Sequence, residues 1–224
     1  MRTAKQLILG SLPTLVFLAV LLLCAGRTGY WQAWAYAAIG MGMNVCTRLV
    51  LRGSPEVARE RLAPGAGAKS WDKALLGLGS MLTLATLVVA GLDSGRCHWE
   101  PRLPWPWAAV GALLAVAGAA GFLAAMKENR FFSAVVRVQT DWGHTVCTTG
   151  PYGIVRHPGY AGMIVGTLGL PLLLTSLWSA LPALVSCALL VVRTALEDNA
   201  LARELPGYAD YRRTTRWRLA PGVW

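Results

Sequence analysis

The chain has 224 residues, of which 55% are apolar and 14% charged, and its net charge at pH 7 is +10. A soluble domain of this length usually carries about 25% charged residues, so these charges are too few to cover a globular surface and lipid must be the solvent for much of the chain. The basic residues lie between long apolar runs and form no single stripe. This argues against nucleic-acid binding and is typical of the positive-inside bias of membrane proteins.

The cysteines and histidines do not show the spacing of a disulfide-bonded or metal-binding protein. The cysteines are odd in number, contain no CxxC spacing and fall partly inside apolar runs, and the three histidines are scattered. Disulfide scaffolds and zinc sites need paired or clustered ligands. The sequence therefore predicts neither disulfides nor a metal site.

The apolar runs predict the membrane spans in chain order. The first, residues 7–25, is interpreted as a retained helix, because leucines and not small residues precede Cys24 and further spans follow. Residues 31–51, 74–92 and 107–126 are each near the ~20 residues that cross a bilayer. Residues 160–192 are too long for one helix, and Pro171 and the segment 175–179 are expected to break them into a hairpin. The fold class predicted is an all-α integral membrane protein with about six transmembrane helices, the last two a hairpin.

Charge sets the predicted orientation. If the N-terminus is inside, the outer loops hold only Arg27, Arg96 and Arg102 of the 21 Lys and Arg residues. An odd number of spans would put the basic tail outside, so even parity with both termini cytoplasmic is expected. The arginine-heavy, Ala/Gly-rich composition is bacterial in style, which indicates the inner (plasma) membrane. A GxxxG at Gly162 and Gly166 is predicted to mark close helix packing.

Polar residues define where chemistry could occur. Residues 1–126 are read as four helices with loops, and residues 127–224 as the catalytic region. In that region the polar segments 127–158 and 193–224 flank the hairpin, so both of its ends bring polar groups to the same cytoplasmic face. The cytoplasmic segments at the mouth of the hairpin are therefore the predicted site.

Individual residues at this mouth have alternative readings. Residues 136–140 alternate enough to be extended, and Gly150-Pro151 reads as a turn. Arg156 and His157 precede a helix that begins with Pro158, although each alone could be an interfacial anchor. If the last helix continues beyond the membrane, Arg193 and Glu197 lie one turn apart on one face, with Asp198 about 100° around the helix. Ionisable groups at the end of a span favour a functional role, while the alternative is a surface salt bridge.

These motifs together resemble one family. The pattern from Asn129 through His144-Thr-Val-Cys-Thr-Thr-Gly to Arg156-His157-Pro158-Gly159-Tyr160 is similar to the isoprenylcysteine carboxyl methyltransferase family. The following hairpin, Arg193-xxx-Glu197-Asp198 and the Gly207-Tyr208-xx-Tyr211 ending continue the resemblance over roughly residues 125–220. The wider superfamily includes phospholipid N-methyltransferases and bacterial membrane thiol methyltransferases.

The resemblance implies S-adenosylmethionine as cofactor, held at the cytosolic face without a Rossmann domain. The chain correspondingly lacks a GxGxxG between a strand and a helix. By position, the implied cofactor-binding residues are His144, Val146, Thr148, Tyr152, Arg156, His157, Tyr160, Glu197 and Asp198. The implied catalytic residues are Arg193, near the methyl-accepting group, and Glu197. Asp198 stands where the family commonly has a second Glu, and the turn before Tyr208 is shorter.

The resemblance leaves the acceptor open. Prenylated protein carboxylates, small thiols, lipid amines and isoprenoid or fatty carboxylates all fit, so the expected partners are membrane lipids and a lipophilic or small methyl acceptor. One alternative is an NADPH-dependent reductase of the sterol-reductase type, whose motif typically reads His-Pro-Asn-Tyr with a nearby Glu. Here the sequence reads His157-Pro158-Gly159-Tyr160 with neither. The other alternative is a non-enzymatic membrane protein or transporter, but no repeat between halves is visible.

Overall fold

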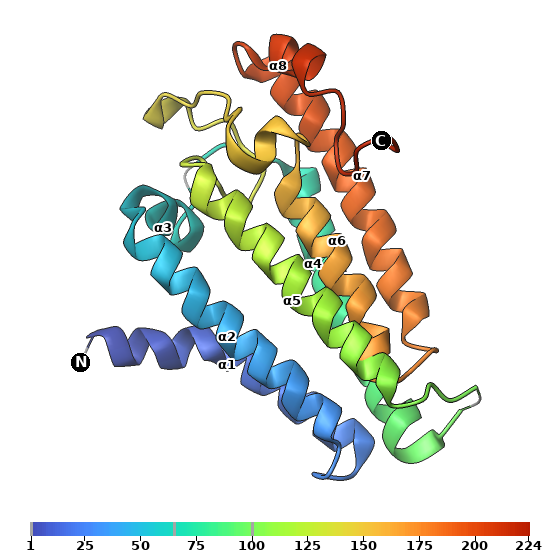
Figure 1. Cartoon of the computed structure of the whole chain (residues 1–224). Coiled ribbons are helices and arrows are strands. Elements are labelled where there is room, and N and C mark those ends of the chain that lie inside the picture. Colours follow the sequence, from blue (N-terminus) through green and yellow to red (C-terminus); the bar gives the residue numbers. More distant parts are fainter. Residues whose placement is uncertain (1, 65, 100) are drawn as a thin grey trace.

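The computed structural model describes residues 2–64, 66–99 and 101–224, without the side chains of residues 2–9 and 62. Within these residues, six long helices form the bundle in Figure 1: α1 (Arg2–Ala25), α2 (Trp31–Arg52), α4 (Ser70–Leu92), α5 (Pro106–Glu128), α6 (Pro158–Leu173) and α7 (Ala180–Glu204). Shorter elements are α3 (Pro55–Leu62), α8 (Tyr208–Thr214), a π-helical turn η1 (Asp93–Cys97) and the 3₁₀ turns η2 (Thr140–Trp142) and η3 (Gly150–Gly153). Each predicted span matches a long helix, and α7 continues to Glu204, beyond residue 192 where the last predicted span ends.

The helices are those of an all-α membrane protein. Among the described residues, three helices are long and apolar enough to cross a membrane: α4 extended through η1, α5 and α7. Residues 10–25 and α6 are shorter apolar helices. Large apolar side chains cover the outside of the bundle, with Leu113 71% exposed and Leu181 68% exposed, as expected where lipid is the solvent. The number of crossings, six, remains a prediction.

The hairpin is confirmed, and one local expectation about it is wrong. Pro171 lies inside α6 and does not end it; the helix ends two residues later, and Thr175 then adopts a positive φ of 50° in the hairpin tip. Residues 136–139 belong to no helix, no strand occurs in the described part of the chain, and the extended conformation expected for residues 136–140 stays a prediction. The Val136 amide donates instead to the carboxylate of Asp72 over 2.8 Å, and Thr140 begins η2.

The most extensive helix contact joins α5 to α6 and not the two arms of the hairpin. Glycines make this approach possible. A Cβ at Gly118 would lie 2.4 Å from the Gly166 amide nitrogen, and one at Gly162 would lie 2.6 Å from the Gly118 carbonyl oxygen. These distances are below any normal contact, so the backbones touch, as in small-residue packing of membrane helices. The predicted packing role of Gly162 is confirmed, and its partner is α5.

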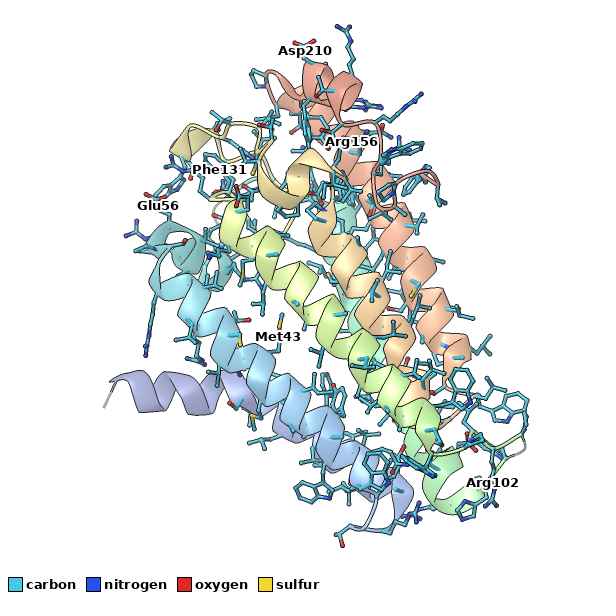
Figure 2. All side chains as sticks on the ribbon, viewed as in Figure 1. Met43, Glu56, Arg102, Phe131, Arg156 and Asp210 are labelled. Carbon is cyan, nitrogen blue, oxygen red and sulfur yellow. The ribbon has the colours of Figure 1, made fainter. Side chains whose placement is uncertain are left out.

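The end of the bundle that holds Arg156 carries most of the irregular structure, while Arg102 lies at the opposite end (Figure 2). The segment between α5 and α6, α3 and the tail with α8 all gather at the Arg156 end (Figure 1). This arrangement brings the segments predicted to be polar into contact.

The α5–α6 seam gives a direct test. Replacing Gly118 by Ala should lower the thermal unfolding midpoint of the detergent-purified protein, because overpacking a tight contact typically destabilises by about 1–3 kcal/mol. The matched control is Gly77→Ala on α4, where a Cβ meets nothing within 4 Å. It should be neutral or slightly stabilising, since Ala favours helix over Gly. Equal midpoints for the two variants would contradict the seam.

Candidate functional site

A cavity of about 310 Å³ opens among the elements at the Arg156 end, a volume within the usual range of small-ligand sites. Its walls come from α3, α4, α5, the segment between α5 and α6, α6, α7 and α8. The sequence-predicted residues that line it are His144, Val146, Tyr152, Arg156, His157, Tyr160, Arg193 and Glu197. Thr148 is exposed and Asp198 fully buried, and neither lines the cavity. The cavity therefore lies where the sequence-predicted residues come together, and Thr148 and Asp198 are not part of its wall.

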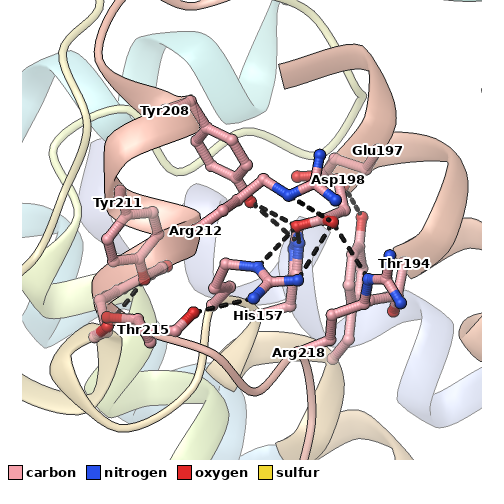
Figure 3. Close-up of polar contacts among 12 residues, drawn as sticks. His157, Thr194, Glu197, Asp198, Tyr208, Tyr211, Arg212, Thr215 and Arg218 are labelled. Atoms are coloured by element: carbon pink, nitrogen blue, oxygen red, sulfur yellow. Dashed lines mark hydrogen bonds and ion pairs between the residues drawn. The ribbon is translucent and has the colours of Figure 1, made fainter. Parts of the chain in front are cut away.

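Asp198 is the centre of a buried polar network behind the cavity wall. Its carboxylate is 0% exposed and accepts hydrogen bonds from Arg156 Nε at 2.8 Å, Tyr208 Oη at 2.9 Å and Arg218 Nε at 3.0 Å. His157 Nε2 lies 3.3 Å from Asp198 Oδ1. Figure 3 shows His157, Tyr208 and Arg218 converging on this carboxylate. Because protein donors surround both oxygens, Asp198 orients residues of the site instead of facing a ligand.

The C-terminal segment completes the same network. Arg156 Nη1 donates to the carbonyl oxygens of Thr215 and Arg216, both at 2.8 Å. The backbone amides of Arg156 and His157 donate to the carbonyls of Trp217 and Arg218, both at 2.9 Å. The tail thus fixes the two residues that precede α6, a contact that the sequence did not indicate.

Arg193 on α7 is held by a carboxylate from α4. Its Nε donates to Asp72 Oδ1 at 2.7 Å and its Nη2 donates to Asp72 Oδ2 at 3.2 Å and to the Ala134 carbonyl at 3.1 Å. The Arg193 guanidinium also lies 5.1 Å from the centroid of the Tyr160 ring, within cation–π range. The sequence analysis did not select Asp72. Like Arg193, however, Asp72 is an ionisable residue at the end of a span, and such residues favour a functional role.

Tyr160 connects the two catalytic candidates. Its hydroxyl donates a short hydrogen bond to Glu197 Oε2 while its ring lies beside Arg193. His157 stacks on the Tyr160 ring at a centroid distance of 5.9 Å and an interplanar angle of 17°. Arg193 and Glu197, one turn apart on α7 as predicted, therefore both reach one aromatic ring.

The segment between α5 and α6 is anchored to α3. Arg137 Nη2 donates to Glu60 Oε2 at 2.7 Å and its Nε to Glu60 Oε1 at 2.9 Å, while the Ser133 hydroxyl donates to the same carboxylate at 2.8 Å. The Arg137 and Glu60 side chains are both buried. Glu60 and Asp72 both precede residue 127, where the predicted catalytic region begins.

The imidazole of His144 is neutral in this setting. It stacks on Phe131 with centroids 4.5 Å apart, and Nδ1 accepts a hydrogen bond from the Gln139 amide at 3.2 Å. Burial, and then the positive charge of Arg137, lower the pKa of His144 from its usual 6.5 to about 4. A protonated Nδ1 could not accept the Gln139 bond, which agrees with this direction.

Tyrosines close the cavity wall next to the tail. The Tyr211 hydroxyl donates to the Tyr152 carbonyl at 2.7 Å, and the Asn129 amide approaches the Tyr152 hydroxyl at 3.4 Å. Burial raises the pKa of Tyr152 well above its usual value. The phenol is therefore a neutral hydrogen-bonding group.

The comparisons with known proteins agree with this geometry. The model of the "Isoprenylcysteine carboxyl methyltransferase (ICMT) family" matches residues 110–203. "Probable protein-S-isoprenylcysteine O-methyltransferase" of Oryza sativa is 31% identical over 144 residues, covering 64% of this chain and 71% of the relative. The chain belongs to the isoprenylcysteine carboxyl methyltransferase family. The matched range includes the cavity residues His144 to Glu197, and the predicted family resemblance is confirmed.

Two bacterial relatives carry metal-resistance names. The "Cobalt-zinc-cadmium resistance protein CzcN" of Cupriavidus metallidurans is 30% identical over 141 residues, 62% of this chain. The "Nickel-cobalt-cadmium resistance protein NccN" of Alcaligenes xylosoxydans xylosoxydans is 29% identical over 143 residues, also 62% of this chain. The chain spans 61% and 62% of the lengths of these relatives. Among the described residues of this chain, no group of three or more His, Cys, Asp or Glu is placed to hold a metal ion.

The pKa of His144 predicts a pH effect on stability. In the unfolded chain His144 takes up a proton below about pH 6.5, whereas in the fold it stays neutral down to about pH 4. The fold therefore loses stability as the pH falls through this window, and the contribution is fully present above it. His144→Gln should flatten the fall in unfolding midpoint between pH 7 and pH 5 in detergent. An unchanged slope would contradict a buried, neutral His144.

Proposed function

We propose that the protein is an S-adenosylmethionine-dependent methyltransferase that acts on a lipophilic or small acceptor at the cytoplasmic face of a bacterial inner membrane. The observation that carries this proposal is the cavity in which Arg193, Tyr160 and Glu197 meet, within the range matched by the family. Members of the family generally use S-adenosylmethionine. Family membership favours methyl transfer over the reductase alternative.

The residues of the cavity fit this cofactor chemically. Glu197 supplies a carboxylate that can accept hydrogen bonds from an ammonium group or ribose hydroxyls, and it lines the cavity beside the hydroxyl of Tyr160. The faces of Tyr152 and Tyr160 can stabilise a sulfonium charge. His144 and Val146 border the same space. Thr148 has no place in this set, and Asp198 acts through Arg156 and His157.

The chemistry asks little of the protein beyond alignment. When bound, S-adenosylmethionine supplies an already activated methyl group. The chain's part is to orient the acceptor and exclude water, which contributes much of the rate in such reactions. Arg193, fixed by Asp72 and the Ala134 carbonyl, is suited to orient the accepting group. The acceptor atom, whether oxygen, sulfur or nitrogen, stays open.

Substitutions on α7 test the two roles separately. Glu197→Gln should weaken S-adenosylmethionine binding by about tenfold or more, because it removes a charged acceptor. Arg193→Lys should lower turnover far more than cofactor affinity, because Lys lacks the planar donor pair that Asp72 holds. Binding of radiolabelled S-adenosylmethionine and methyl transfer to a panel of lipophilic acids, thiols and amines would be measured on the same preparations.

The matched control is Glu204→Gln on the same helix. Glu204 forms a partly exposed ion pair with Lys69 at 2.6 Å and does not line the cavity, so it should change neither readout. Wild-type affinity in Glu197→Gln would refute the cofactor site. Normal turnover in Arg193→Lys would return that arginine to a structural role.

The orientation is tested through Cys97, which is exposed and belongs to η1 at the end of α4. If both termini are cytoplasmic, a variant with Cys97 as its only cysteine should react with a membrane-impermeant maleimide in intact cells. A second variant with its only cysteine at position 210, in the exposed tail, should react only after permeabilisation. The reverse pattern would overturn the proposed topology.

A further inference from the structure

A second cavity lies at the end of the bundle that holds Arg102, opposite the candidate site (Figure 2). Its volume is about 200 Å³. Its walls come from the loop between α1 and α2, from η1, from the segment that follows η1 and from the hairpin tip between α6 and α7. The proposed function does not use this cavity, which is called the Arg102 pocket below.

Positive charge exceeds negative charge among the described residues that line the Arg102 pocket. Arg27 and Arg102 both line it, and they are two of the three arginines that the predicted topology leaves on the outer side, where basic residues are disfavoured. His98 adds a ring nitrogen. Asp93 is the one carboxylate among these described residues; it is 5% exposed, and its Oδ2 accepts a hydrogen bond from Ser176 Oγ at 2.6 Å. Two guanidinium groups are therefore set against one carboxylate that is already hydrogen-bonded within the protein.

Hydrogen bonds between distant segments hold the wall of the pocket in place. Arg27 Nη2 donates to the Ser94 carbonyl at 2.9 Å, and Ser94 Oγ donates to the Leu174 carbonyl at 2.9 Å. Gln32 Nε2 donates to Thr175 Oγ1 at 3.1 Å. The α1–α2 loop, α2, η1 and the hairpin tip thus fix the shape of the pocket together.

The backbone around the pocket adopts unfavourable conformations. His98 and Thr175 both line it, with φ angles of 49° and 50°, and in the described part of the chain they are the only non-glycine residues with positive φ. Such a residue typically costs about 1–3 kcal/mol, and such residues cluster at ligand sites. The wall also contains the π-helical turn η1, a feature frequently found at functional sites. The concentration of these features at one pocket favours a role in binding.

Tryptophans indicate that the pocket lies at the level of lipid headgroups. Trp99 lines the pocket, and its ring meets that of Trp178 edge to face at a centroid distance of 6.5 Å. Trp105 and Trp107, at the start of α5, are 71% and 47% exposed. Tryptophan rings prefer the boundary between membrane and water, where the apolar body and the polar N–H are both accommodated. The anion present at that level is the phosphate of a phospholipid.

We propose that the Arg102 pocket binds the phosphate of a phospholipid headgroup. Arg27 and Arg102 supply the planar, two-pronged donors that suit phosphate oxygens, and His98 supplies a further hydrogen-bonding group. The pocket lies at the opposite end of the bundle from the candidate site, so this inference does not depend on the proposed function.

The test compares lipids that share the same acyl chains. Binding of radiolabelled dioleoyl phosphatidylglycerol, dioleoyl phosphatidylethanolamine and dioleoylglycerol to the protein in a neutral detergent would be measured at pH 7.5. The wild type should prefer at least one phospholipid over dioleoylglycerol by about tenfold, the effect of one charge-assisted interaction. Arg27→Gln and Arg102→Gln should each lower this preference, and the double variant should abolish it. Arg102→Met, which keeps the apolar stem, should lower it as well and serves if a Gln variant does not fold.

The matched control is Arg96→Gln in η1, at the same end of the bundle. Arg96 Nη2 donates to the Leu23 carbonyl at 2.8 Å, and Arg96 does not line the pocket, so this variant should keep the wild-type preference. No preference in the wild type, or a preference that survives in the double variant, overturns the site. A loss in Arg96→Gln as large as that in Arg27→Gln also overturns it, because general positive charge and not the pocket would then explain binding.

Inorganic phosphate distinguishes the lipid from a free anion. Added at millimolar concentration, it should displace the phospholipid only weakly, because it has no acyl chains to bury. Binding of radiolabelled phosphate that depends on Arg27 and Arg102, without a preference for either phospholipid, would overturn the lipid headgroup as the occupant.

Discussion

The buried carboxylate of Asp198 is the interaction on which the site depends. It lies on α7 and ties together the residues that precede α6, the first residue of α8 and the C-terminal tail. A carboxylate removed from water is unfavourable unless its oxygens are fully hydrogen-bonded, and here they are. Removing one partner of such a pair typically costs about 3–5 kcal/mol, because the remaining charge is left uncompensated. Four segments separated in the sequence are thereby held in one arrangement.

Two further ion pairs hold residues of the N-terminal half against the rest of the site in the same way. Asp72 on α4 fixes Arg193 on α7, and Glu60 on α3 fixes Arg137 between α5 and α6. Such pairs add little net stability compared with apolar packing. Their effect is to set positions, because a carboxylate from an earlier helix holds each of these two arginines, which line the cavity, and Asp141 also pairs with Arg137. The early helices are therefore part of the site and not only a membrane anchor.

The sequence indicated the helices and the end of the bundle where chemistry could occur, because both follow from composition. Apolar runs of span length must be helical in lipid, and ionisable groups at span ends identify the polar mouth. It could not indicate which carboxylate pairs with which arginine. Glu197 and Asp198 are adjacent, but about 100° of rotation puts one in the cavity and the other in the network behind it. That outcome depends on how α7 packs against α4 and α6. The α5–α6 contact was hidden for a similar reason, since glycine spacing indicates a close approach without naming the partner.

The ion pairs around the cavity determine which polar groups remain available to a ligand. At the polar end, the donors of Arg156 and most of those of Arg193 are occupied by Asp198, Asp72 and backbone carbonyls. That end consequently presents Glu197 and tyrosine hydroxyls, which suits a ligand with ammonium or hydroxyl groups. Because Arg193 and Glu197 both reach Tyr160, groups bound by these two residues would lie next to each other, which is the arrangement that transfer of a group between them requires.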